Sequence, residues 1–222
     1  FARCLGIPEK QNEQKKTQDR NCCSCSWLLE CRYHVIDHPL RADGLHSLLY
    51  KCPNCLSEGE TESETDTLRC RKCGKAWYME TDGSLRALEG ETEFSHIPDW
   101  SNWERECVRK EIENDTYQLK VPVNICMMVN MKSIYRVGEG ILEHNKDGFR
   151  LTGCEGKLEY SQKPTTSYSL YADYYWYEIG DVIGIGDNEF SYFCFPRKEV
   201  SVTKARLATE ELYKMKKQRK RV

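Results

Sequence analysis

The chain has 222 residues, a formal net charge of −2, and 31% charged against 39% apolar residues. This composition is typical of a soluble polypeptide of one or two domains, and a charge so close to zero gives no argument for a nucleic-acid or membrane partner. No stretch approaches the roughly twenty apolar residues of a membrane-spanning helix, and no secretory signal is visible. Thirteen cysteines could form a secreted disulfide scaffold, but the odd count and their isolated positions favour a reducing cytoplasm. Because the first residue is Phe1, we expect an upstream part of the protein.

Residues 1–40 read as a linker and a cysteine-rich lead-in. Positions 8–20 show no apolar period, which is typical of a linker or a solvated helix. The following segment contains Cys22, Cys25, Cys31 and His34, which could bind a second zinc ion through three sulfurs and one imidazole. The spacing is cramped, and the neighbouring Trp27 could equally mark a small apolar core. Both interpretations stay open.

The strongest chemical signal is a pair of Cys-x-x-Cys motifs, Cys52/Cys55 and Cys70/Cys73, at the separation of a zinc ribbon. Each motif lets two thiolates bind one ion from a tight turn, and the loop between the motifs completes a tetrahedron. Gly74 can adopt the positive φ that such a turn requires. We therefore predict a Zn²⁺ site made of these four cysteines, inside a zinc-ribbon domain at 41–92.

The loop of the predicted ribbon is strongly acidic. Its carboxylates alternate with small polar residues, which is typical of a solvated hairpin tip; they are Glu58, Glu60, Glu62, Glu64 and Asp66. Cations line the second cysteine pair, at Arg69, Arg71, Lys72 and Lys75. The acidic tip would repel phosphates, so a nucleic-acid partner is disfavoured.

A linking helix is predicted at 98–115, where Pro98 precedes a capping box formed by Ser101 and Glu104. Beyond it the apolar period becomes that of strands, with a hairpin turn at 145–148 and a second one around 186–188. A final amphipathic helix carries one apolar stripe, formed by Val202, Ala205, Ala208, Leu212 and Met215. The predicted fold is α+β: a zinc ribbon, a linking helix, and at 117–218 an antiparallel β-barrel of pleckstrin-homology-like type, capped by the C-terminal helix.

Catalytic signals are weak. His38 and Asp43 match the His-x4-Asp pattern of glycerolipid acyltransferases, in which the histidine deprotonates the acceptor hydroxyl and the aspartate orients the imidazole. The chain lacks a segment resembling the Glu-Gly-Thr-Arg that accompanies this pattern, so a loop leading into the ribbon is the better interpretation. Cys126, Cys154 and Cys194 lie in apolar strands, where buried structural thiols are expected.

The chain ends in a run of cations, Lys216, Lys217, Arg219, Lys220 and Arg221. Such a cluster can hold an anionic bilayer surface, at about 1 kcal/mol per cation near the lipid. A solvated helix end explains it equally well. The expected location is therefore the cytoplasm, with peripheral membrane contact as an option.

From residue 41 onward the sequence resembles the C-terminal extension of bacterial 1-acyl-sn-glycerol-3-phosphate acyltransferase-like proteins. The likeness lies in residues 41–45 (RADGL), 49–55 (LYKCPNC), 70–75 (CRKCGK), 88–100 (LEGETEFSHIPDW), 174–181 (YYWYEIGD) and 210–214 (EELYK). The resemblance implies an upstream acyltransferase domain that makes phospholipid precursors, so its catalytic residues have no counterpart here. It also implies that Cys52, Cys55, Cys70 and Cys73 bind metal.

These observations predict an accessory region that positions an acyltransferase-like enzyme or binds a partner, and that is not catalytic by itself. The alternative is a stand-alone zinc-ribbon module that binds protein or nucleic acid. The sequence does not define the oligomeric state.

Overall fold

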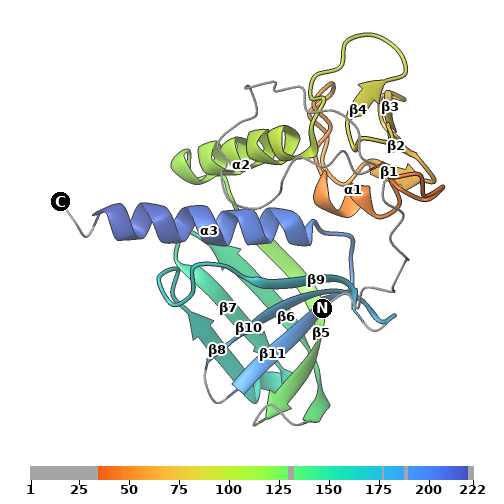
Figure 1. Ribbon diagram of the computed structural model, residues 1–222. Coiled ribbons are helices and arrows are strands. Elements are labelled where there is room, and N and C mark those ends of the chain that lie inside the picture. Colours follow the sequence, from red (N-terminus) through yellow and green to blue (C-terminus); the bar gives the residue numbers. More distant parts are fainter. Residues whose placement is uncertain (1–34, 130–132, 177, 188–189, 220–222) are drawn as a thin grey trace, which may run out of the picture. The chain divides into compact units, whose positions relative to one another are not determined.

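The computed structural model describes residues 35–129, 133–176, 178–187 and 190–219. Within these residues the fold is α+β, with two antiparallel sheets and three α-helices (Figure 1). In chain order the elements are α1 (Leu45–Leu48), β1 (Thr61–Glu64), β2 (Thr67–Cys70), β3 (Ala76–Met79), β4 (Leu85–Ala87), α2 (Ile97–Glu113), β5 (Leu119–Val129), β6 (Ser133–Asn145), β7 (Gly148–Gly153), a 3₁₀ turn (Cys154–Gly156), β8 (Leu158–Gln162), β9 (Tyr171–Trp176), β10 (Gly180–Gly186), β11 (Phe190–Pro196) and α3 (Val202–Arg219).

The smaller sheet has the strand order β1-β2-β3-β4 and lies within the region of the predicted ribbon, 41–92. Trp77 on β3 pairs with Leu68 on β2 and with Ala87 on β4, so its side chain lies at the centre of this sheet. Trp77 is fully buried and packs edge-on against Trp100 of α2, with ring centroids 4.8 Å apart. The ribbon therefore shares its core with the helix that follows it. Residues 48–50, which lead into the first cysteine pair, are the end of α1 and a loop.

The larger sheet has the order β8-β7-β6-β5-β11-β10-β9. Alternate residues of β5, Val121, Val123 and Ile125, are buried in its main core, as the strand period predicts. The hairpin expected at 145–148 is confirmed, because Asn145 ends β6 and pairs with Gly148 at the start of β7.

The prediction of a closed barrel is wrong, because the larger sheet is open. Strands β8 and β9 are the two edges of the sheet, and no strand ladder joins them in the described part of the chain. A side chain approaches the gap: Gln162 at the end of β8 accepts a hydrogen bond from the backbone N–H of Gly186 on β10, at 3.1 Å. The pairing of β9 with β10 reaches only as far as Gly184, so this hydrogen bond joins the edge strand β8 to the part of β10 that lies beyond it.

Helix α2 begins one residue earlier than predicted and ends two residues earlier. Pro98 lies in its first turn, where a missing backbone N–H costs nothing. The predicted capping box is wrong, because His96 precedes the helix without a side-chain cap and Ser101 lies inside it. Glu104 is fully buried instead of reaching back to the helix start.

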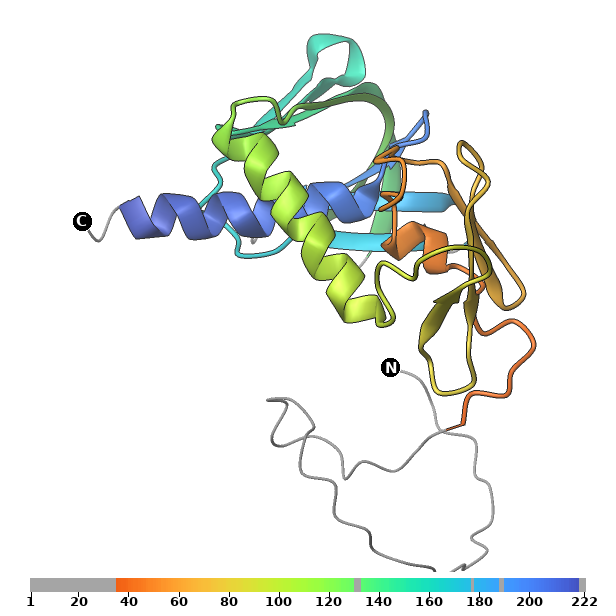
Figure 2. The same cartoon turned by 90° about the horizontal axis from the view of Figure 1, so that it is seen from above.

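Helix α3 is enclosed on all sides from Leu207 to Leu212, although its sequence predicts a single buried stripe. Val202 and Ala205 pack into the core of the larger sheet, and Leu207 and Ala208 pack with residues of α2 and the ribbon. Figure 2 shows α2 crossing α3. Within the described ranges, no helix is long and apolar enough to cross a membrane.

Candidate metal centre

The four predicted ligands come together. Cys52 and Cys55 lie in the turn between α1 and β1, and Cys70 and Cys73 lie where β2 turns into β3. Their Sγ atoms all lie within 4.8 Å of one another, so this group could hold a metal ion. Cys52 and Cys70 are buried, whereas Cys73 is exposed.

The two turns that carry the ligands have the same backbone construction. The N–H of Leu56 donates to the carbonyl of Cys52, and the N–H of Gly74 donates to the carbonyl of Cys70, both at 2.9 Å. The residue after each second cysteine has a positive φ, 60° at Leu56 and 77° at Gly74. Gly74 behaves as the sequence predicts. The first turn places a leucine in the conformation that glycine adopts more easily.

The sulfurs differ in their surroundings. Burial raises the pKa of Cys52, with backbone N–H groups acting in the other direction. Burial also acts to raise the pKa of Cys55, but hydrogen bonds from the hydroxyl and backbone of Ser57 outweigh it and lower that pKa to about 6. Ser57 Oγ lies 2.9 Å from the Sγ of Cys55 and 3.6 Å from that of Cys70. Ser57 is therefore positioned to stabilise thiolates at two of the four ligands.

Two side chains of helix α2 form hydrogen bonds with the backbone of Lys51, the residue just before the first candidate ligand. The N–H of Lys51 donates to Glu104 at 2.8 Å, and the carbonyl of Lys51 accepts from Trp100 Nε1 at 2.9 Å. Trp100 and Glu104 are four residues apart and so lie on one face of the helix. Burial raises the pKa of Glu104 to about 8, although the N–H groups of Lys51 and Tyr50 act to lower it. We call these two contacts of Trp100 and Glu104 with Lys51 the clamp. The sequence analysis did not predict it, although the spacing of four residues between Trp100 and Glu104 places both on one helix face.

Lysines connect the ribbon to both helices. Lys51 Nζ lies 3.0 Å from Glu58, and Lys204 of α3 lies 2.7 Å from Glu58 and 2.7 Å from Glu111 of α2. Thr203 of α3 adds a hydrogen bond to the carbonyl of Ser47, at 2.6 Å. Glu58 was predicted to belong to a solvated tip, but it forms part of this network.

The cations of the second turn are partly neutralised. Arg71 lies 3.6 Å from Glu60, and Lys75 pairs with Glu93. Arg69 and Lys72 are exposed. Two paired cations weaken the case for a phosphate-binding surface on this face.

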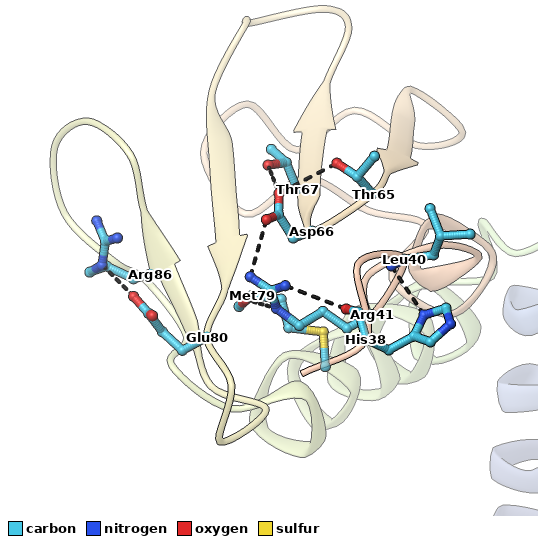
Figure 3. A network of polar contacts seen from close by, with 9 residues as sticks. All are labelled: His38, Leu40, Arg41, Thr65, Asp66, Thr67, Met79, Glu80 and Arg86. Atoms are coloured by element: carbon cyan, nitrogen blue, oxygen red, sulfur yellow. Dashed lines mark hydrogen bonds and ion pairs between the residues drawn. The ribbon is translucent and has the colours of Figure 1, made fainter. Parts of the chain in front are cut away.

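Figure 3 shows the surroundings of the predicted His-x4-Asp pattern. His38 is exposed, and its Nδ1 accepts a hydrogen bond from the N–H of Leu40 at 3.1 Å. Arg41, between the two pattern residues, donates to the carbonyl of Met79 and lies 3.1 Å from Asp66. In the structure as described, no hydrogen bond joins His38 to Asp43. These contacts indicate that the loop stabilises the ribbon, and they do not support a catalytic pair of His38 and Asp43.

Two cysteines of the larger sheet have the surroundings of structural thiols. Cys194 is buried, and burial raises its pKa to about 12. Burial also raises the pKa of Cys126, which suits a structural thiol better than a nucleophile. The possible second zinc set, Cys22, Cys25, Cys31 and His34, lies outside the described residues.

The comparisons with known proteins give no family. No protein-family model, no curated protein and no solved structure matches this chain.

Proposed function

We propose that Cys52, Cys55, Cys70 and Cys73 hold a structural Zn²⁺ ion. The observation that carries this proposal is the convergence of four sulfurs within 4.8 Å of one another. A set of four thiolates is the donor set of structural zinc, and it leaves no position open for substrate or water. The ion would supply folding energy to the ribbon and no catalytic chemistry.

The clamp on Lys51 supports a structural role for the metal. Glu104 accepts from the backbone N–H of Lys51 and Trp100 donates to its carbonyl, so both backbone polar groups of the residue before Cys52 are held. Metal, ribbon and α2 would then form one cooperative unit, because the turn is held by the ion on one side and by the helix on the other.

The test of the centre is elemental analysis of the purified chain. We expect one equivalent of zinc, four thiols that react with a thiol reagent only after chelation, and loss of zinc in the Cys70→Ser variant. A purified chain without metal, or with disulfides between these cysteines, would contradict the proposal.

We further propose that the chain is a non-catalytic accessory region of an acyltransferase-like protein of phospholipid synthesis. Two features support this role over an enzymatic one. Four thiolate ligands would leave no coordination position for a substrate. The His38 imidazole accepts a hydrogen bond from the backbone of Leu40 and has none with Asp43 in the described structure. Its partner would be an upstream acyltransferase domain, which the region would position.

An acyl-transfer assay tests the accessory role. We expect no transfer from an acyl thioester to lysophosphatidic acid by this chain alone. Turnover above background that His38→Ala abolishes would overturn the proposal. If instead the chain bound RNA or DNA with a steep salt dependence, the alternative of a stand-alone zinc-ribbon module would replace it.

The end of α3 offers a contact with anionic membrane. Lys217 is exposed and lies near the ring of Tyr213, and Lys216 is half-buried beside it. We expect binding to phosphatidylglycerol vesicles that weakens with added salt and is lost in Lys216→Gln/Lys217→Gln. Equal binding to uncharged phosphatidylcholine vesicles would rule out an electrostatic contact.

A further inference from the structure

The sulfurs of the four candidate ligands also face one another in two pairs, each of which joins one cysteine turn to the other. The Sγ atoms of Cys52 and Cys73 lie 3.7 Å apart, and those of Cys55 and Cys70 lie 3.7 Å apart as well. The sulfurs of a disulfide lie about 2.0 Å apart, so each pair needs a small approach to form one. We call these two pairs the crossed pairs.

Each crossed pair combines a buried sulfur with an accessible one. Cys52 and Cys70 are buried, whereas Cys73 is exposed and Cys55 is half-buried. Thiol–disulfide exchange begins at a sulfur that the oxidant can reach, and it is completed by a second sulfur that lies close to the first. Both crossed pairs have this arrangement.

Disulfides in the crossed pairs would hold the ribbon together better than disulfides within each turn. Cys52 and Cys73 are 21 positions apart in the sequence, and Cys55 and Cys70 are 15 positions apart. The two cysteines of one Cys-x-x-Cys motif are only three positions apart. A disulfide restricts the unfolded chain, and this effect grows with the length of the loop that it closes. Folding of the ribbon therefore favours the crossed pairs.

The loops closed by the crossed pairs contain the strands of the ribbon that need support. Strand β1 and most of β2 lie between Cys55 and Cys70. The two buried sulfurs, those of Cys52 and Cys70, belong to the ribbon core together with Trp77. Crossed disulfides would thus join the same two turns, and fix the same two core residues, as a bound metal ion would.

From this geometry we propose that the metal-free ribbon forms two disulfides, Cys52–Cys73 and Cys55–Cys70, which replace the ion as the link between the turns. This inference rests on the proposed zinc centre and adds redox control to it. The ribbon is folded when it is reduced and zinc-bound or oxidised and metal-free, and it unfolds when it is reduced and metal-free. The two folded states exclude each other, because a sulfur in a disulfide is no longer a thiolate ligand.

A small disulfide such as oxidised glutathione can serve as the oxidant. The Cys73 thiolate attacks one of its sulfurs, which forms a mixed disulfide and releases one glutathione. The Cys52 thiolate then attacks the sulfur of Cys73 and displaces the second glutathione. The two cysteines lose two electrons, the oxidant gains them, and the two thiol protons pass to the two glutathione thiolates. Cys55 and Cys70 react in the same way, with the more accessible Cys55 first.

The test uses the full chain, stripped of metal under reducing conditions and then oxidised with oxidised glutathione. Peptide mapping without reduction identifies the disulfides, because trypsin separates Cys70 from Cys73 and fragmentation before Pro53 separates Cys52 from Cys55. We expect the two crossed disulfides. The oxidised chain should lose zinc binding, and reduction with dithiothreitol should restore it to one equivalent.

Hydrogen exchange shows whether the disulfides hold the ribbon. With a chelator present, residues 61–79 should be protected in the oxidised chain and unprotected in the reduced chain. Two double variants, each lacking two zinc ligands, form a matched comparison. Cys52→Ala/Cys73→Ala keeps one crossed pair, and Cys52→Ala/Cys55→Ala keeps the pair within one turn. After oxidation, protection should return in the first variant and stay absent in the second.

Three outcomes would overturn the inference: disulfides within the turns or to cysteines elsewhere in the chain, an oxidised ribbon as unprotected as the reduced one, or full zinc binding after complete oxidation. The zinc content of the chain purified under reducing conditions tests the proposed centre separately. A reduced chain that binds no zinc would contradict the centre, and the peptide map would then decide the pairing by itself.

Discussion

The two sheets differ in what holds them together. Ribbon strands are three or four residues long, whereas β5 and β6 run for eleven and thirteen residues. The ribbon core includes two of the candidate ligands, Cys52 and Cys70. The core of the larger sheet consists mainly of aliphatic and aromatic side chains from most of its strands, together with Cys194 and two residues of α3. A few short strands bury little apolar surface, so on the proposal above the ribbon would depend on its metal ion and the larger sheet would not.

The largest difference between the two sheets is expected when one of the four candidate metal ligands is removed. We expect Cys73→Ser to lose zinc and to unfold the ribbon, at a cost on the order of 10 kcal/mol. The larger sheet should remain folded, because its main core contains no residue of the ribbon. Hydrogen exchange followed by peptide checks this, with protection lost near 48–80 and kept in β5, β6 and β11.

The matched control for this change is Cys107→Ser. Cys107 lies on α2, is half-buried, and is not a member of the cysteine cluster. Its variant should keep one equivalent of zinc. Collapse of both sheets in Cys73→Ser would show that the two regions fold as one unit.

The reverse experiment targets the larger sheet. Leu142 is fully buried in its core, so Leu142→Ala should reduce the free energy of unfolding of this region by about 2–5 kcal/mol. Zinc content should stay at the wild-type value, because the ribbon core contains no residue of β6. Denaturant unfolding, followed together with release of zinc to a chromogenic chelator, measures both. Simultaneous loss of zinc and sheet structure at one denaturant concentration would contradict the comparison.

Features that depend on nearby residues could be predicted from the sequence. The clustering of the four cysteines followed from two Cys-x-x-Cys spacings, and the hairpin at Asn145 and Gly148 followed from turn residues between apolar strands. Each signal is complete within a few residues. The four sulfurs then needed only a short loop to meet.

Features that depend on distant parts of the chain could not be predicted. Glu104 reads locally as a capping residue, but its partner is the peptide of Lys51, fifty-three residues away. The sequence of α3 predicts one buried stripe that leaves out Leu207, because it does not show that α2 covers the other side of the helix. The prediction that the larger sheet closes into a barrel was wrong for the same reason, since closure depends on pairing between the distant strands β8 and β9.

The contact between Glu104 and Lys51 predicts that stability depends on pH. Burial raises the pKa of Glu104 to about 8, so the folded chain keeps a proton that the unfolded chain loses above its ordinary pKa of 4.5. The folded state then binds more protons between these values, and its stability falls as pH rises, by up to about 1.4 kcal/mol per pH unit. Glu104→Gln keeps an oxygen for the N–H of Lys51 and should remove this slope.

Urea unfolding at several pH values between 5 and 8 measures the effect, which is a slope and therefore insensitive to a constant offset from the substitution. Glu106→Gln is the control, because Glu106 is exposed on the same helix. It should leave the slope unchanged. A Glu104→Gln variant with the wild-type pH dependence would show that another group titrates.

The smallest expected effect separates the two ligand turns. Gly74 has a φ of 77°, and its counterpart Leu56 has a φ of 60° with an exposed side chain. A residue with a Cβ costs about 1–2 kcal/mol in this region, part of which is offset by the greater freedom of glycine in the unfolded chain. Gly74→Ala should therefore destabilise the ribbon by about 1 kcal/mol, and Leu56→Gly should stabilise it by slightly less. Competition for zinc against a chelator detects both changes with opposite signs, and equal signs would mean that the two turns are not equivalent.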